Sequence, residues 1–272
     1  MNVIVEMLSF PFIQRAFLVG IFVSLCAALI GVSLVLKRYS MIGDGLSHVS
    51  FGALAIAMAL HMAPLKFSIP VVVVAAVLLL RMRENGHMKS DAAIGVVSAS
   101  ALAIGVIVTS LSSGLNADAY SYMFGSILAQ SREDVILSII LSVCVLALFL
   151  FCYHKIFAVT FDETFARASG VKVGFYNTMI AILTAITIVL GMRMMGAMLI
   201  SSLIIFPALT SMAVFKSFRS VVLSSGSLAV LCFIIGLITS YILETPVGAS
   251  IVLTNLIVFL LFRGFGIIRS RF

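Results

Sequence analysis

Two residues with metal-binding side chains, Asp44 and His48, lie four positions apart in the segment GDGLSHVS. On a helix this spacing places both side chains on one face, with Cβ atoms about 5–6 Å apart. A carboxylate oxygen and an imidazole nitrogen form a suitable partial ligand set for Zn²⁺, and also for Mn²⁺. Gly43 and Gly45 flank the aspartate and would allow either a close backbone approach or a break in the helix. The pair is a candidate metal site that needs further ligands from elsewhere.

A purely structural interpretation fits the same spacing. Asp44 would be an acidic residue at the start of a helix, where the macrodipole favours it, and His48 would be a packing residue. Hydropathy places Asp44 near the inner end of its apolar segment, so a metal path there requires the preceding segment to dip into the membrane. The other three histidines fall at a helix end or in basic loops, and the fourteen methionines are more typical of core filling than of a Cu(I) path.

The segments that position these residues are long and apolar. Hydrophobic residues make up 62% of the 272 residues and charged residues 10%, whereas soluble domains have about 45–50% and about 25%. An apolar run of about 20 residues crosses a bilayer as a helix, because its backbone groups then pair internally. We therefore expect an all-α fold, a polytopic transmembrane helical bundle of about eight or nine spans. The candidate spans are 15–36, 44–60, 67–82, 92–112, 134–153, 173–192, 196–215, 221–243 and 247–263.

The basic residues predict the orientation of this bundle. If nine spans place the C-terminus inside, all but four of the seventeen Lys and Arg residues fall on the cytoplasmic side, as the positive-inside rule requires. The net charge of +7 is thus typical of membrane topology, and lipid rather than nucleic acid is the expected partner. Tyr120 to Ala129 is too short to cross and is expected as a re-entrant or interfacial segment. No long hydrophilic linker interrupts the chain, which predicts a single transmembrane domain over 1–272.

The inside connection from His154 to Lys172 predicts a short amphipathic helix. Thr160 and Glu163 match the S/T-x-x-E capping box, and Gly170 suits a helix stop. The resulting helix, within 160–171, has about two turns and cannot span a membrane. It would lie on the membrane surface or insert into a groove of a partner protein.

Several chemistries are not indicated. The phosphate-binding pattern G-x-x-x-x-G-K-[ST] is absent from the sequence, so any ATP would be hydrolysed by another polypeptide. The four cysteines lie far apart without a CxxC pairing, and no serine lies in a G-x-S-x-G turn. We expect a transporter subunit and not an enzyme.

Four segments, in order along nearly the whole chain, carry a resemblance to a known family. They are LKRYSMIGDGLSHVSFGALAIA (36–57), SYMFGSILA (121–129), DETFARASGV (162–171) and GAMLISSLIIFPALT (196–210). The sequence resembles the ABC-3 family of metal ABC importer permeases, which serve zinc and manganese uptake in bacteria.

The resemblance implies a set of functional residues and partners. Asp44 and His48 would line the metal path, and the coupling helix that docks on the ATPase would carry Asp162, Glu163, Ala166 and Gly170. A second permease chain, a cytoplasmic ATPase subunit and an extracytoplasmic metal-binding protein would complete the importer in the bacterial cell membrane. The metal would be transported substrate and not a permanently bound cofactor. SYMFGSILA is closer to the zinc-type members, which favours Zn²⁺ over Mn²⁺ or iron.

Three other functions fit parts of the pattern. An ion-coupled secondary transporter should show repeated halves around broken helices, and we find no convincing repeat. A non-transporting scaffold predicts that Asp44 and His48 are dispensable for metal uptake. A related permease for siderophores or cobalamin is less compatible with an Asp–His pair, which suits a bare ion better than a bulky chelate.

Overall fold

The computed structural model describes residues 9–84, 90–112 and 132–271, and these residues form helices and short connections without any strand. The predicted all-α fold is therefore confirmed. The helices are α2 (Pro11–Leu36), α3 (Ile42–Ala59), α4 (Pro64–Glu84), α5 (Ser90–Leu111), α7 (Arg132–Phe151), α8 (Tyr153–Phe161), α9 (Glu163–Ala168), α10 (Val173–Met195), α11 (Ala197–Val214), α12 (Phe218–Leu243) and α13 (Val247–Arg271).

Each of the nine predicted spans corresponds to one long helix. Eight of these helices, among the described residues, are long and apolar enough to cross a membrane. The ninth segment is α11, whose apolar part, Leu199–Val214, is shorter. The predicted re-entrant segment Tyr120–Ala129, together with SYMFGSILA, lies outside the described residues. The span count of eight to nine thus agrees with the prediction.

The helix ends differ from the predicted bounds where proline or arginine extends a helix. Helix α2 begins at Pro11, before the expected residue 15, because proline lacks only a donor that the first turn leaves unpaired in any case. Helix α13 continues to Arg271, past the expected end at 263. Arginine is a good helix former in water, so a helix can continue beyond the apolar region that hydropathy detects.

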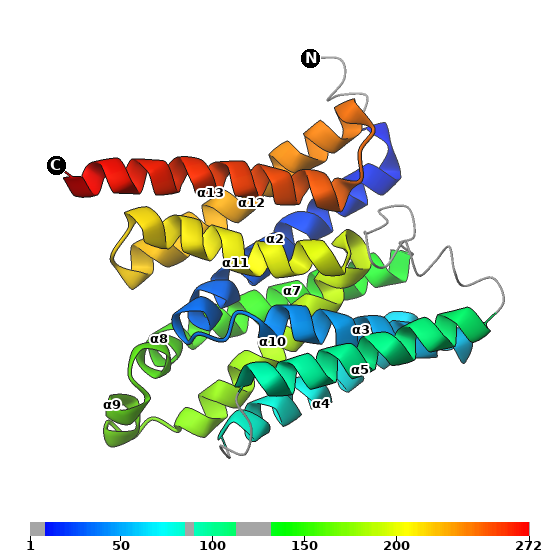
Figure 1. Ribbon diagram of the computed structural model, residues 1–272, viewed down its shortest axis with the longest axis horizontal. Helices are drawn as coiled ribbons and strands as arrows, with labels where there is room; N and C mark the ends of the chain where they lie inside the picture. The colour runs from blue at the N-terminus through cyan, green and yellow to red at the C-terminus, as the bar shows by residue number, and fades with distance from the viewer. Residues whose placement is uncertain (1–8, 85–89, 113–131, 272) are drawn as a thin grey trace.

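Successive long helices run in alternating directions and place the connections at two opposite ends (Figure 1). Helices α8 and α9 lie at the same end as the last turn of α13, and the first turn of α2 lies at the other end with the turn between α12 and α13. This grouping matches the connections that the positive-inside rule assigns to one side. The orientation in the membrane, with α9 inside, stays a prediction.

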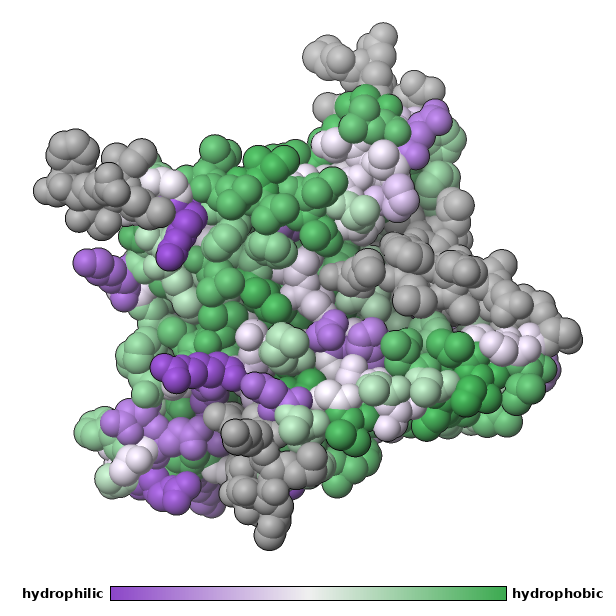
Figure 2. Space-filling view, in the orientation of Figure 1, coloured by the Kyte–Doolittle hydropathy of each residue, from purple (hydrophilic) through white to green (hydrophobic). Residues whose placement is uncertain are grey.

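The outer surface of the bundle is largely apolar, and Figure 2 shows hydrophobic residues over most of one face. Side chains such as Ile107, Ile140 and Leu260 are 57%, 59% and 59% exposed. In water such exposure would be unfavourable, whereas lipid tails are as apolar as these side chains. The hydrophilic residues on this face gather mainly around the end that carries α9.

Small residues bring the helices of the interior into close contact. A Cβ atom on Gly52 of α3 would lie 2.7 Å from the backbone oxygen of Ala101 in α5. A Cβ atom on Gly31 of α2 would lie 2.1 Å from the backbone oxygen of Ile204 in α11. Helix α3 is therefore held against α5, and α2 against α11, at distances that only glycine permits.

Candidate metal path and coupling site

Asp44 and His48 lie on one face of α3, as the spacing predicts. Asp44 is in the first turn of this helix, and its Oδ2 lies 3.7 Å from His48 Nε2. Two ligands of a tetrahedral zinc ion with bonds of about 2.1 Å would be about 3.4 Å apart, so a small side-chain adjustment would let both bind one ion. The Asp44 side chain is 50% exposed and that of His48 is 23% exposed. Their neighbours from Ile42 to Ala55 are otherwise buried.

The glycines beside Asp44 serve close packing and do not break the helix. A Cβ atom on Gly43 would lie 3.3 Å from Ile204 Cδ1 of α11, and one on Gly45 would lie 2.6 Å from Ile94 Cγ2 of α5. Helix α3 continues without interruption from Ile42 to Ala59. Of the two roles that the sequence left open for these glycines, the structure supports close approach. The first turn of α3 is thereby held between α5 and α11.

The Asp44 turn is set back into the bundle. Figure 1 shows that α3 begins farther from the α8–α9 end than α10 does. Tyr39, in this turn, is only 6% exposed. A small hydrophilic patch over α3 interrupts the hydrophobic face in Figure 2. Tyr39 is thus packed within the bundle while Met41 beside it is 54% exposed, and a metal path at Asp44 stays a prediction.

The pair does not complete a metal site by itself. Among the described residues, no third His, Cys, Asp or Glu joins Asp44 and His48 in a group able to hold an ion. Met192 and Met195 are 0% and 4% exposed within the apolar core, as expected for core-filling residues. His61 has a φ of 54° at the end of α3, where its backbone donates to Met58.

Helix α9 lies within the predicted coupling segment, but its first turn is capped by a different residue. Asp162 is the N-cap, and its Oδ1 accepts a hydrogen bond from the Phe165 backbone at 2.9 Å. The expected cap, Thr160, is instead part of α8 and is 8% exposed. The predicted capping box of Thr160 and Glu163 is therefore wrong. Helix α8 continues to Phe161, and the backbone becomes extended only at Asp162, where a short carboxylate is a strong N-cap.

The predicted stop at Gly170 is confirmed in detail. Gly170 has a φ of 79°, a left-handed conformation that suits glycine. Its backbone donates to Arg167 at 3.1 Å, and the Val171 backbone donates to Ala166 at 2.9 Å. These two bonds form a Schellman motif. Ala166 is 1% exposed and packs with Val159 and other apolar side chains of α8 and α10.

The exposed surface of this region is aromatic. Phe165 of α9 is 67% exposed and Phe161 of α8 is 57% exposed. Helix α8 contacts α12 through aromatic rings. The ring centroid of Phe218 in α12 lies 5.0 Å from that of Phe157 and 5.8 Å from that of Phe161. Burial raises the pKa of the nearby Tyr153 phenol, and the positive charge of Arg219 offsets part of that effect. Helices α8 and α9 thus carry the exposed phenyl rings of Phe161 and Phe165, and packing against α12 holds α8 in place.

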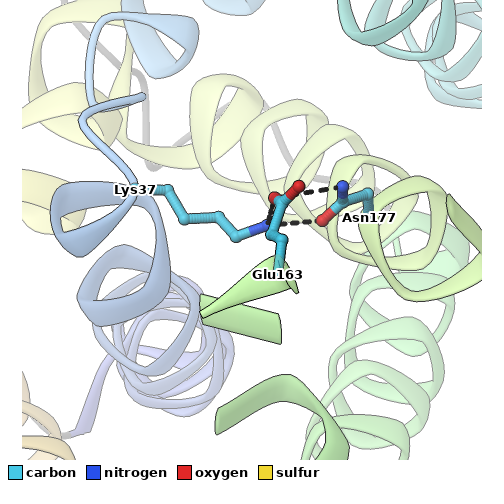
Figure 3. A network of polar contacts seen from close by, with 3 residues as sticks. All are labelled: Lys37, Glu163 and Asn177. Carbon is cyan, nitrogen blue, oxygen red and sulfur yellow. Dashed lines mark hydrogen bonds and ion pairs between the residues drawn. The ribbon is translucent and has the colours of Figure 1, made fainter. Parts of the chain in front are cut away.

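Glu163 takes part in a polar network that sequence reasoning missed. Its Oε1 lies 2.8 Å from Nζ of Lys37, the residue that follows α2, and accepts from Nδ2 of Asn177 in α10 at 3.3 Å. The Lys37 ammonium also donates to Oδ1 of Asn177, which closes the triangle in Figure 3. In sequence, Lys37 looks like any other basic residue at the inner end of a span. The two ionic partners are 126 positions apart in the chain, so the pair leaves no local signal in the sequence.

Comparison with known proteins gives one consistent result. The ABC 3 transport family matches residues 9–265. The manganese import system permease protein ScaB of Streptococcus gordonii is 31% identical over 93% of this chain and 90% of its own. The high-affinity zinc uptake system membrane protein ZnuB of Haemophilus influenzae is 29% identical over 93% of this chain and 97% of its own.

A solved structure agrees with these relatives. PsaBC from Streptococcus pneumoniae, in complex with Fab, has a TM-score of 0.86 and 29% identity, covering 96% of this chain and 94% of the other. Members of the family work with an ATPase and a substrate-binding protein in ABC importers. The chain belongs to the ABC 3 transport family and is a multi-pass permease subunit of a bacterial metal importer of the manganese and zinc type.

Proposed function

We propose that this permease carries Zn²⁺ into the cytoplasm, with Mn²⁺ as the second candidate. The observation that carries the proposal is the Asp44–His48 pair, whose side chains are partly exposed on an otherwise buried helix turn. Ionisable residues at such positions are costly unless they meet a cavity, a partner or an ion. In this proposal Asp44 and His48 bind the transported ion, and the whole chain, 1–272, acts as one transmembrane permease domain.

The ligand types support zinc. An imidazole nitrogen with a carboxylate oxygen is a common part of zinc sites, whereas manganese prefers a larger share of oxygen ligands. Manganese is the second candidate because ScaB, at 31% identity, is a manganese import permease, while ZnuB, at 29%, is a zinc one. The ion would be transported substrate, bound transiently and released after each cycle.

A second copy of the chain is the proposed source of the missing ligands. The metal-binding face of α3 is partly open in the single chain, and a homodimer would bring two Asp44–His48 pairs toward one path. Such an arrangement would supply up to four ligands, the number typical of a zinc site. Homodimer formation is thus linked to the completeness of the metal site.

In this proposal, the conformational change of the ATPase would reach the permease through α9. We propose that the exposed phenyl rings of Phe161 and Phe165 insert into a groove of a cytoplasmic ATPase subunit. Asp162 caps this helix, Ala166 packs it against α8 and α10, and Gly170 ends it. These three residues would hold the coupling helix in place. An extracytoplasmic metal-binding protein would deliver the ion to the opposite end of the bundle.

The test is transport by the full complex in proteoliposomes, with the permease, its ATPase and its metal-binding protein. We expect uptake of Zn²⁺ that requires ATP and all three components, and slower uptake of Mn²⁺ at equal concentration. Uptake driven by an ion gradient through the permease alone would reject the proposal. Faster uptake of Mn²⁺ would keep the importer but assign manganese as its substrate.

A further inference from the structure

Three side chains from three different helices meet at the α9 end of the bundle. Lys37 follows the last residue of α2, Glu163 is the first residue of α9, and Asn177 lies in the second turn of α10. Each of the three contacts the other two, as Figure 3 shows. The triangle is the polar contact that ties the coupling helix to α2 as well as to the neighbouring α10.

The lysine of this triangle is shielded from water. Its side chain is 9% exposed and Asn177 is 8% exposed, whereas the Glu163 side chain is 44% exposed. A cavity of about 20 Å³ beside Lys37 and Asn177 has room for about one water molecule. Separating Lys37 from Glu163 and Asn177 would take two polar partners away from an ammonium group that is largely shielded from water, which is unfavourable. When α9 moves, the end of α2 is therefore expected to follow it.

The connection beyond Lys37 is short and partly hydrogen bonded. The Arg38 backbone donates to Val35 at 3.0 Å and the Tyr39 backbone to Leu34 at 2.8 Å, which closes the end of α2. The backbones of Ile42 and Gly43 then donate to Tyr39 and Ser40 at 3.2 and 3.3 Å. Arg38 has a φ of 56°, so the turn is tight even without a glycine. We therefore expect a displacement of Lys37 to be passed on through this short turn to the start of α3.

We propose that Lys37, held by Glu163 and Asn177, is a positioning residue that transmits the movement of α9 to the α3 turn carrying Asp44. The inference rests on the proposed function, because it takes α9 as the contact with the ATPase and Asp44 as part of the metal path. In this mechanism Lys37 and Glu163 move together, and the α2–α3 turn changes the position of Asp44 relative to its ion. ATP hydrolysis without this link would proceed but would move little metal.

The decisive measurement is the number of ATP molecules hydrolysed for each metal ion imported by the full complex in proteoliposomes. Lys37→Met is expected to raise this ratio roughly tenfold, a typical coupling effect between two sites, while ATP hydrolysis itself changes little. Lys37→Arg keeps the charge and both contacts, and should bring the ratio back toward wild type. Lys216→Met removes an exposed lysine at the same end and serves as the control.

A double variant separates coupling from stability. Lys37→Met alone removes the ammonium group that contacts Glu163 and Asn177 and is expected to lower stability. Lys37→Met with Glu163→Met removes both charges and should restore melting temperature and yield, since an ion pair with a buried member is often replaceable by apolar residues. The ATP-to-metal ratio should remain high, because the contact between Lys37 and Glu163 that joins α2 to α9 is absent.

The outcomes distinguish this inference from the proposed function. A wild-type complex that imports metal with ATP, together with a normal ratio in the double variant, would overturn the positioning role of Lys37 alone. A wild-type complex that fails to import metal with ATP would overturn both. A purely structural ion pair predicts that stability and ratio recover together in the double variant, whereas we expect only stability to recover.

Discussion

Arg193, in the last turn of α10, forms a 2.7 Å ion pair with Asp134, in the first turn of α7. Each charge has the sign that its own helix end favours, since the macrodipole is positive at the N-terminus and negative at the C-terminus. The side chains are 11% and 19% exposed. Two further nitrogens of Arg193, Nε and Nη1, are buried without a hydrogen-bond partner among the described residues. Asp134 is therefore a main source of compensation for this buried guanidinium.

The first prediction concerns this pair. Asp134→Asn should destabilise the permease by about 3 kcal/mol, because it leaves the buried charge of Arg193 poorly compensated. The melting temperature in detergent should fall clearly. Glu133→Gln, at the exposed neighbouring position in the same turn, is the matched control and should change stability by less than about 0.5 kcal/mol. Equal effects of the two variants would contradict the role assigned to the Arg193–Asp134 pair.

The second prediction separates metal binding from helix capping at Asp44. Asp44 and Asp91 are both acidic residues in the first turn of a helix, α3 and α5 respectively. Asp44→Asn removes a charged ligand and should lower ATP-dependent zinc uptake roughly tenfold or more, as should His48→Ala. Asp91→Asn loses the same helix-terminal charge effect and should leave uptake near wild type. If Asp44 only stabilises its helix, the two aspartate variants will transport equally well.

The third prediction concerns the packing of α3 on α5. Gly52→Ala places a methyl group 2.7 Å from the backbone oxygen of Ala101, so the two helices must separate. We expect a loss of about 1–3 kcal/mol, seen as a lower melting temperature in detergent. Gly95→Ala on α5 has open space around it and is the control. It should be neutral or stabilising by up to about 1 kcal/mol, because alanine favours the helix. A neutral Gly52→Ala would show that the α3–α5 contact is looser than the structure indicates.

The fourth prediction concerns the surface that meets the ATPase. Phe165→Ala should weaken binding of the ATPase subunit roughly 30-fold, the effect of truncating an aromatic residue that contributes about 2 kcal/mol to an interface. Co-purification and titration of the purified subunits would measure the change. Phe12→Ala removes a ring that is 38% exposed at the opposite end of the bundle, and should leave the affinity unchanged. A normal affinity for Phe165→Ala would place the contact on another part of this end.

Features with a local cause could be predicted from the sequence. The nine apolar segments correspond to helices because a chain that crosses lipid must satisfy its backbone hydrogen bonds within each segment. Gly170 ends α9 because a left-handed residue is needed there and glycine adopts it without strain. Asp44 and His48 share a face because four residues make about one helical turn. The prediction that Thr160 caps α9 was wrong for a local reason as well, since Asp162 is the stronger N-cap residue.

Sequence alone therefore determined a membrane-spanning helical bundle, the helix that carries the Asp44–His48 pair and the position of α9, because hydropathy and spacing act within one segment. Tertiary structure alone decided that Lys37 meets Glu163 and Asn177, that Arg193 meets Asp134, and that Gly43 and Gly45 face α11 and α5. These contacts join residues far apart in the chain, and their energies depend on burial that no local pattern encodes. The α3 turn is consequently a metal-path candidate by sequence, whereas its proposed link to α9 through Lys37 depends on contacts that only the tertiary structure shows.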